Sequence, residues 1–298
     1  MKILYTGSNG LLGQKISHAT PTFPQHEFLA TSRGANRTQN MGTAAYASMD
    51  ITDREDVLRV VGEFQPDAII HGAAMTHVDE CELYPEQATL MNVEGTRHMA
   101  EAAQQVGAHL VHISTDFIFD GKDGPYKEEA EPNPISHYGW TKLEAEKIVE
   151  QLSSYSILRT VLVIGMAEDL SRSNIVLWAK GALEKGQAIN VVDDQFRTPT
   201  LAEDLAQGAL LAADQRAQGV FNISGPDYMS IYELVGQVAQ HFNLSMDSVT
   251  RVDSTTLNQP AKRPPITGFD ISKARKELGY APHTFAEALE IITQQAGL

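Results

Sequence analysis

The feature that most constrains this fold is a glycine-rich turn, residues 6–13 (TGSNGLLG), which lies between an apolar run at 2–6 and a helical pattern. Gly7 permits a tight turn, Gly10 lets a phosphate approach the backbone, and Gly13 lets helix and strand pack closely. The spacing GxxGxxG differs from the common GxGxxG but meets the same requirements. The helix N-terminus adds unpaired N–H groups and a partial positive charge. We therefore expect a dinucleotide pyrophosphate to bind at Gly7, Ser8, Asn9, Gly10, Leu11, Leu12 and Gly13.

Short apolar runs alternate with helical patterns along the first half of the chain. Further runs lie at 27–31, 67–71, 109–114 and 156–164, and the clearest helical pattern covers 85–106. Strands that alternate with helices of this length form βαβ units with right-handed crossovers. The sequence thus predicts an α/β protein with a Rossmann-like, doubly wound parallel sheet. A glycine turn inside the first βαβ unit favours a dinucleotide site over a turn without a ligand.

The end of the second predicted strand indicates which dinucleotide binds. An acidic residue there would hydrogen-bond the ribose 2′-hydroxyl of NAD. This chain has Arg33 at that place, with Arg37 close behind, and no carboxylate. Arg33 can hold a 2′-phosphate in a forked contact. The sequence therefore favours NADPH, and NADH stays open if Arg33 is a solvated loop cation.

The alternation loosens after residue 164. Helices are expected over 174–185, 201–213 and 230–242, strands over 188–192 and 219–224, and a proline-containing loop over 258–269. We expect residues 1–164 to form the NADP-binding Rossmann domain, completed by about 199–224. Residues 165–298 should form mainly a smaller α/β substrate-binding lobe that is interleaved with it.

Charge and composition argue against several other classes of protein. Lys+Arg 23 against Asp+Glu 38 gives a net charge of -15, which argues against nucleic acid or an anionic membrane as a partner. The single cysteine, Cys81, excludes an internal disulfide, and no apolar run approaches the about 20 residues that span a bilayer. The N-terminus does not resemble a signal peptide, so we expect a cytoplasmic protein. No metal is expected, because no zinc-type spacing relates His71, His77, His109 and His112.

A candidate catalytic group lies in the middle of the chain. A spacing of four places Tyr138 and Lys142 on one face of a helix. A nearby ammonium stabilises a phenolate, so we expect Lys142 to lower the pKa of Tyr138 and also to reach the ribose hydroxyls of the cofactor. Thr115, at the end of the 109–114 run, can polarise a substrate carbonyl.

With these residues the chain resembles the extended short-chain dehydrogenase/reductases, specifically the dTDP-4-dehydrorhamnose reductase family. The resemblance spans nearly the whole chain, and its central stretch is far more specific than a bare YxxxK. It rests on 71–74 (HGAA), Val78-Asp79, Glu82, Asn92, 114–121 (STDFIFDG), Pro125-Tyr126, Glu128, Pro134, 138–144 (YGWTKLE), 194–196 (DQF), Pro199-Thr200 and Arg263-Pro264.

The resemblance implies a role for each of several residues. Tyr138 would be the general acid, Lys142 its partner, Thr115 the carbonyl-polarising hydroxyl, and Asp116 a group that shapes the site. Asn92 would either reach Lys142 through water or simply bond a neighbouring strand. The cofactor would also contact Asp50 and Ile51 beside the adenine, with Ala73 and Ala74 along the cleft. The substrate would contact Thr76, Val78, Thr115, Phe117, Arg197 and Arg263.

Two departures from the family pattern leave the sugar open. The segment 262–270 (KRPPITGFD) differs from the usual tail, and Arg197 stands where many relatives have a small residue. Arg159, Arg197 and Arg263 are candidate clamps for a nucleotide diphosphate. Arg263 is preferred because prolines fix its loop.

These observations lead to one main function and two alternatives. The main expectation is an NADPH-dependent reductase of a nucleotide-activated 4-keto-6-deoxy sugar, with hydride delivered to C4, compatible with a homodimer. The first alternative is an epimerase or dehydratase that retains its NAD. By resemblance, dehydratases carry an Asp-Glu pair after the active-site Thr, whereas this chain has Asp116-Phe117. The second is a non-catalytic NADP-binding subunit that resembles the regulatory subunit of methionine adenosyltransferase.

Overall fold

A seven-stranded parallel sheet forms the centre of the molecule, in a computed structural model that describes residues 1–168 and 174–297. Its strand order is β11-β6-β5-β4-β1-β2-β3. The predicted α/β class and doubly wound parallel sheet are therefore confirmed. The strands are β1 (Lys2–Thr6), β2 (Glu27–Ser32), β3 (Ala45–Ser48), β4 (Ala68–His71), β5 (His109–Thr115), β6 (Tyr155–Thr160) and β11 (Gly219–Ile223).

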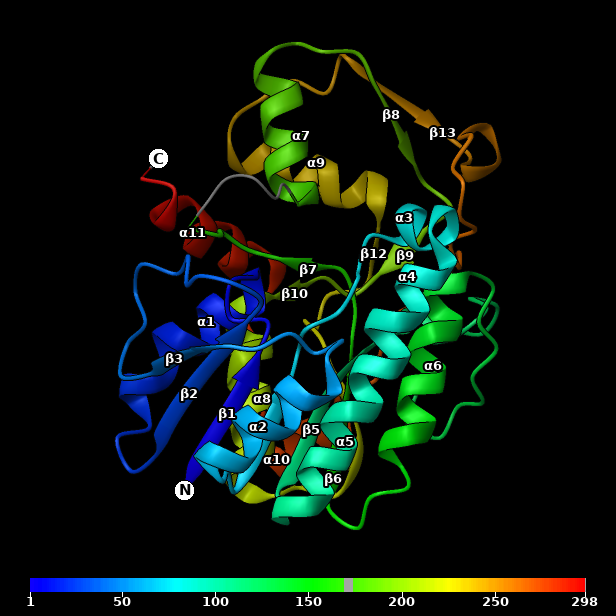
Figure 1. Ribbon diagram of the computed structural model, residues 1–298. Coiled ribbons are helices and arrows are strands. Elements are labelled where there is room, and N and C mark those ends of the chain that lie inside the picture. The colour runs from blue at the N-terminus through cyan, green and yellow to red at the C-terminus, as the bar shows by residue number, and fades with distance from the viewer. Residues whose placement is uncertain (169–173, 298) are drawn as a thin grey trace.

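Helices cover both faces of this sheet, because its strands are apolar on both sides (Figure 1). On β1, Ile3 and Tyr5 point into one core and Leu4 into the other. The first face carries α1 (Leu11–Ala19), α8 (Ala202–Gln215) and α10 (Ser272–Leu278). The second carries α2 (Arg54–Phe64), α5 (Gly95–Val106) and α6 (His137–Val149).

The helical pattern predicted over 85–106 is one helical stretch with a change of geometry. It consists of α4 (Pro85–Thr89), a π-helical turn at Leu90–Glu94, and α5. Before it lies the short helix α3 (Val78–Leu83). π-Turns inside helices are frequent at functional sites, and this one carries Asn92.

A smaller lobe lies above the sheet in Figure 1 and has its own hydrophobic core. Its helices α9 and α11 begin with capping boxes, in which Ser230 pairs with Glu233 and Thr284 with Glu287. β11 lies far along the chain yet joins the main sheet beside β6, and the exact domain boundaries stay a prediction. The lobe and its junction contain β7 (Val163–Ile164), α7 (Ile175–Glu184), β8 (Ile189–Val192), β9 (Phe196–Arg197), β10 (Thr200–Leu201), β12 (Met229–Ser230), α9 (Ile231–His241), β13 (Val249–Val252) and α11 (Phe285–Gln295).

Short 3-10 turns complete the described elements, at Thr20–Thr22, Asp116–Ile118 and Ser254–Thr256. The residues between Asn258 and Phe269 form the expected loop, tied down by bridges from Tyr126 to Phe269 and from Phe196 to Ile266. Across the described part of the chain, no helix combines the length and the apolar character that crossing a membrane requires.

Candidate active site

One cavity of about 600 Å³ brings most of the predicted site residues together. The cavity lies at the carboxyl ends of the parallel strands. At β1 the strand order changes direction, because β2 and β3 follow on one side of β1 and β4, β5 and β6 on the other. Ligands of open α/β sheets bind at such a point. Five predicted residues lie outside its lining: Ser8, Asn92, Arg159, Arg197 and Arg263. The predicted residues that line it are Gly7, Asn9, Gly10, Leu11, Leu12, Gly13, Arg33, Asp50, Ile51, Ala73, Ala74, Thr76, Val78, Thr115, Asp116, Phe117, Tyr138 and Lys142.

The glycine turn has the shape that a pyrophosphate site needs. Gly7 has φ +75°, and a Cβ there would lie 3.1 Å from the Ala73 backbone. A Cβ on Gly13 would lie 2.4 Å from the Gly7 carbonyl oxygen, so only glycine allows α1 to start this close to β1. Gly10 is the N-cap of α1 and has no side chain to cap the helix. The N–H groups of the first turn, which lines the cavity at residues 11–13, therefore stay available to an anion. The turn therefore fits a dinucleotide phosphate.

Ser8 differs from its neighbours in the turn. It is fully buried, and its N–H donates to the Thr31 carbonyl at 3.0 Å. Its Oγ has no hydrogen-bond partner among the described residues. Ser8 thus faces the interior next to β2 and does not line the cavity.

The adenosine end of the cavity is shaped by Asn9. Its Nδ2 donates to Ser32 Oγ at 2.6 Å and to the Ala35 carbonyl at 3.0 Å, while its Oδ1 accepts from the Arg37 N–H at 2.8 Å. Arg33 is 73% exposed, and its guanidinium lies 3.9 Å from the Asp50 carboxylate. Asn9 therefore holds the loop that carries both arginines at the cavity, and either can meet a 2′-phosphate.

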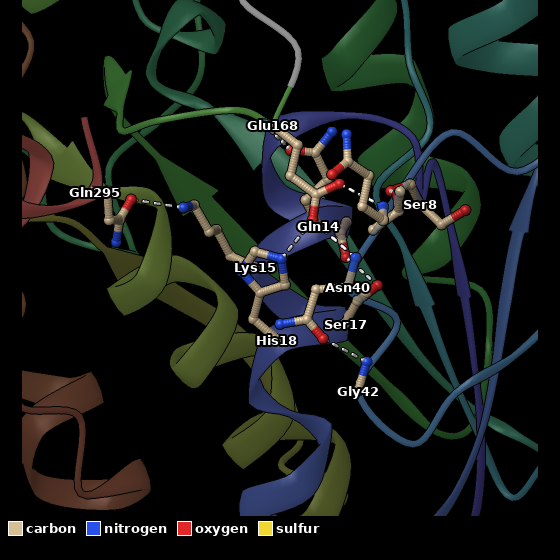
Figure 2. A network of polar contacts seen from close by, with 12 residues as sticks. Ser8, Gln14, Lys15, Ser17, His18, Asn40, Gly42, Glu168 and Gln295 are labelled. Atoms are coloured by element: carbon tan, nitrogen blue, oxygen red, sulfur yellow. Dashed lines mark hydrogen bonds and ion pairs between the residues drawn. The ribbon is translucent and has the colours of Figure 1, made fainter. Parts of the chain in front are cut away.

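The carboxylate of Glu168 holds the loop that carries Arg33 and Arg37 at a second place, beyond Arg37 (Figure 2). Glu168 accepts from the N–H groups of Gln39 at 2.5 Å and Asn40 at 3.1 Å, and its carboxylate lies 2.9 Å from His18 Nε2. Its own N–H donates to Gln14 Oε1 at 2.9 Å. Burial opposes ionisation of this carboxyl, but these donors overcome it and hold the pKa of Glu168 below its usual value. No pattern in the sequence predicted this contact.

At the other end of the cavity, Lys142 is held from the sheet. Its Nζ donates to the Ile113 carbonyl at 2.7 Å and lies 3.2 Å from His112 Nε2. Burial lowers the pKa of Lys142 to about 8. The ammonium is therefore fixed beside β5 and still lines the cavity.

Tyr138 is buried one turn before Lys142 on α6, and its ring packs edge-on against Phe117 at 5.6 Å between centroids. Burial raises the pKa of Tyr138, an effect that the Thr115 hydroxyl only partly offsets. The prediction that Lys142 lowers this pKa is therefore wrong for this structure, since burial outweighs it and the ammonium is bonded elsewhere. A phenol that keeps its proton at neutral pH suits a proton donor.

Asp116 lines the same end of the cavity as Tyr138 and Lys142. It is buried, accepts hydrogen bonds from Thr115 at 3.1 Å and from Thr267, and lies 3.8 Å from Arg197 Nε. Burial raises the pKa of Asp116, and the Arg197 charge opposes the rise. Asp116 thus ties the end of β5 to the loop before α10, which supports the expectation that it shapes the site.

The three predicted arginine clamps are all engaged elsewhere. Arg197 donates to the carbonyls of Phe196, Pro264 and Pro265 at 2.7–3.0 Å. Arg263 forms a two-pronged pair with Asp79 at 2.8 and 3.0 Å, and Arg159 forms a buried pair with Glu146 at 2.8 Å. Among the described residues, the cations that line the cavity are Arg33, Arg37 and Lys142. In this structure the three arginines join parts of the protein to one another, and their role as ligand clamps stays a prediction.

The side-chain amide of Asn92 also makes its hydrogen bonds within the protein. It accepts from the Met75 N–H at 2.7 Å and donates to the Met75 carbonyl and to Thr141 Oγ1, both at 3.0 Å. Of the two expectations for Asn92, the structure shows the bond to a neighbouring segment. Asn92 fixes the loop after β4, which lines the cavity through Ala73 and Ala74.

Two contributors were missed from the sequence. A Cβ on Gly139 would lie 2.1 Å from the Phe117 carbonyl oxygen, so glycine lets α6 approach the turn after β5. The signal was the glycine inside the YGWTK stretch, to which no role was assigned. His112 on β5 contacts Lys142 on α6. This contact depends on how the helix packs on the sheet, which the sequence does not show. No group of three or more potential metal ligands occurs within the described ranges.

Comparison with known proteins identifies the family. The family model for the RmlD substrate binding domain matches residues 1–297. The chain is 31% identical over 279 residues to methionine adenosyltransferase 2 subunit beta of Bos taurus, covering 91% of this chain and 81% of that protein. The crystal structure of a dTDP-4-dehydrorhamnose reductase from Clostridium acetobutylicum superposes with a TM-score of 0.87 at 31% identity, covering 100% of both chains.

A further structural neighbour bears on the cofactor. A dTDP-4-dehydrorhamnose reductase from Bacillus anthracis, crystallised in complex with NADP, has a TM-score of 0.84 and 28% identity over 99% of both chains. That neighbour and the glycine turn agree on a nicotinamide dinucleotide, NADPH with NADH as an alternative. The chain belongs to the RmlD substrate binding domain family, within the extended short-chain dehydrogenase/reductases.

Proposed function

We propose that this protein is an NADPH-dependent reductase of a nucleotide-activated 4-keto-6-deoxy sugar. The observation that carries the proposal is the cavity itself. The phosphate-binding turn lies at one end, and Thr115, Tyr138 and Lys142 lie together at the other. The relatives named dTDP-4-dehydrorhamnose reductase support the sugar class.

Several residues of the cavity each have a separate role in the proposed carbonyl reduction. When bound, the cofactor would supply a hydride to C4 of the ketosugar. Tyr138, which burial keeps protonated, donates its proton to the developing alkoxide oxygen, so that one hydride and one proton reduce the C=O bond. Thr115 and the Lys142 ammonium stabilise the growing negative charge. In the free protein Asp116 accepts from the Thr115 hydroxyl at 3.1 Å and so holds it at the site. Because the hydroxyl has a single proton, it leaves Asp116 when it donates to the alkoxide oxygen.

The phenol of Tyr138 tests this mechanism. In Tyr138→Phe, oxidation of NADPH by dTDP-, GDP- or UDP-linked 4-keto-6-deoxy sugars should fall by about 10²–10⁴-fold, because the proton donor is lost. Binding of NADPH, followed by its fluorescence, should change less than about twofold, since the turn and Arg33 are untouched. Tyr155→Phe, at the distant start of β6, is the matched control. Unimpaired turnover by Tyr138→Phe would exclude this role.

A second candidate is a non-catalytic NADP-binding subunit. Two observations favour it. The methionine adenosyltransferase 2 subunit beta of Bos taurus is 31% identical over 91% of this chain, and the three predicted arginine clamps are engaged within the protein. A stoichiometric complex with a purified methionine adenosyltransferase catalytic subunit, with no turnover of any ketosugar, would support it. Light scattering of the isolated protein would show whether it forms the homodimer that the sequence leaves open, and cell fractionation would test the expected cytoplasmic location.

A further inference from the structure

The catalytic lysine is held by a buried histidine that the proposed mechanism does not use. His112 lies in the middle of β5 and is 1% exposed, with its Nε2 3.2 Å from Lys142 Nζ. Burial drives its pKa well below the usual value for histidine, so the ring is neutral. A neutral imidazole has one acceptor nitrogen. Since an ammonium can only donate, His112 Nε2 is the acceptor of this bond.

The tautomer that makes this bond leaves the second ring nitrogen of His112, Nδ1, buried without a hydrogen bond to the described residues. Nδ1 must carry the proton, and among the described residues it has no hydrogen-bond partner. An unpaired buried donor destabilises a fold by about 1–3 kcal/mol. The observation that carries the proposal is on the opposite side of the ring, where Nε2 contacts Lys142.

We propose that His112 is a positioning residue for Lys142, whose ammonium it anchors together with the Ile113 carbonyl. An ammonium has three N–H donors. Two are used on β5, so the third is directed to the cavity that Lys142 lines, where the cofactor ribose and Tyr138 would meet it. The inference rests on the proposed function for its role in reduction, but the contact itself can be tested without a substrate.

The charge environment explains why an imidazole suits this place better than a carboxylate. A carboxylate would hold the lysine as a tight ion pair and keep its pKa high. The groups that face Lys142 are nearly all neutral: on the sheet His112 and His71, the latter with a pKa lowered to about 3 by burial, and on α3 Cys81, with a pKa raised to about 11 by burial. On its own helix Tyr138 is neutral too.

The exception is one turn further along α6, where Glu146 raises the pKa of Lys142 from a distance. Its carboxylate is committed to Arg159 and Ser114. His112 therefore fixes the position of the ammonium without adding a countercharge, and Lys142 titrates near physiological pH.

A titration of the lysine itself tests the proposal. In protein labelled with ¹³C-lysine, the ¹³Cε signal of Lys142, assigned with Lys142→Arg, should titrate at about 8. In His112→Leu this midpoint should fall by about one pH unit, because a hydrogen bond to the charged form is lost. His112→Gln, whose amide oxygen can take the place of Nε2, should recover at least about half of that shift. An unchanged midpoint in a folded His112→Leu would overturn the proposal.

The same strand provides the matched control. His109 is also buried on β5, but its ring nitrogens bond Ser154 and Ser156 at 2.9 and 2.8 Å, far from the cavity. His109→Gln should leave the midpoint of Lys142 unchanged. If His112→Leu fails to fold, His112→Asn serves instead, since its shorter side chain does not reach Lys142 and should show the same fall.

Kinetics then connect the contact to catalysis. In His112→Leu, kcat for NADPH-dependent reduction should fall about tenfold at pH 7, with the KM for the ketosugar nearly unchanged, because a misplaced ammonium affects the transition state most. The basic limb of the kcat profile should move to lower pH with the NMR midpoint, and His112→Gln should restore both. An absence of ketosugar turnover in the wild type would refute the proposed function, while the lysine titration would still decide the role of His112.

Discussion

At the scale of single residues, close approach decides more of this site than charge does. Gly139 contacts the turn after β5 so closely that a Cβ would lie 2.1 Å from the Phe117 carbonyl oxygen. Gly13 makes the same demand where α1 meets β1. The helices α1 and α6 therefore both depend on a missing side chain for their position.

Gly139→Ala should consequently lower the free energy of unfolding by at least about 2 kcal/mol, because α6 must move away from Phe117. Reductase activity should fall with it, since α6 carries Tyr138 and Lys142. Gly236→Ala in the middle of α9 is the matched control: its Cβ would meet nothing within 4 Å. There alanine should stabilise by about 0.5–1 kcal/mol. Urea unfolding of both variants measures the contrast, and equal effects would contradict the steric argument.

At the scale of elements, α6 is fastened to the sheet by one buried ion pair. Glu146 on α6 meets Arg159 on β6 at 2.8 Å, and it also accepts from Ser114 on β5. The side chains of both ion-pair partners are at most 4% exposed. The pair fixes the helix that carries the reactive residues across two strands.

Glu146→Gln should destabilise the protein by about 3 kcal/mol, since the Arg159 guanidinium is left buried without a countercharge. Glu144→Gln on the same helix breaks only the exposed pair with Lys147 and should change stability by less than about 0.5 kcal/mol. Thermal unfolding of the two variants provides the comparison. A similar, small effect in both would show that the buried pair contributes little.

At the scale of the whole molecule, Glu168 links the segment that leads into the smaller lobe with the loop at the adenosine end. It reaches Gln39 and Asn40 on that loop and Gln14 on α1 (Figure 2). Lys15, one residue on, joins α1 to Glu203 on α8 and Gln295 on α11. The two lobes therefore share a polar network around α1.

Glu168→Gln should weaken NADPH binding roughly fivefold, because the loop with Arg33 and Arg37 loses a charged anchor. Folding lowers the pKa of Glu168, so the anchor is present above the unfolded pKa and is lost as the pH falls through the folded pKa. The difference from wild type should thus shrink on acidification. Glu290→Gln, on the exposed side of α11, is the control. Fluorescence titrations at several pH values measure the affinity of each variant for NADPH. An equal affinity of wild type and Glu168→Gln at pH 7 would show that Glu168 does not anchor the loop.

Local pattern was enough to predict the central sheet, the glycine turn and the meeting of Thr115, Tyr138 and Lys142 at one cavity. Alternating apolar runs specify buried parallel strands, and glycines at 7, 10 and 13 specify a turn that only glycine can make. β3, β13 and the C-terminal helices α10 and α11 were missed, because they are short or partly exposed and their pairing depends on distant segments.

The sequence by itself determined that this chain folds as a dinucleotide-binding α/β protein with Thr115, Tyr138 and Lys142 at one site, because those features depend on spacing along neighbouring strands and helices. Only the tertiary structure decided which charges remain free. Arg263 is taken by Asp79, 184 residues earlier, and Arg197 by carbonyls 67 and 68 residues later. Burial likewise reversed the expected pKa shift of Tyr138. Pairing and desolvation depend on three-dimensional contacts, and spacing along the chain does not contain them.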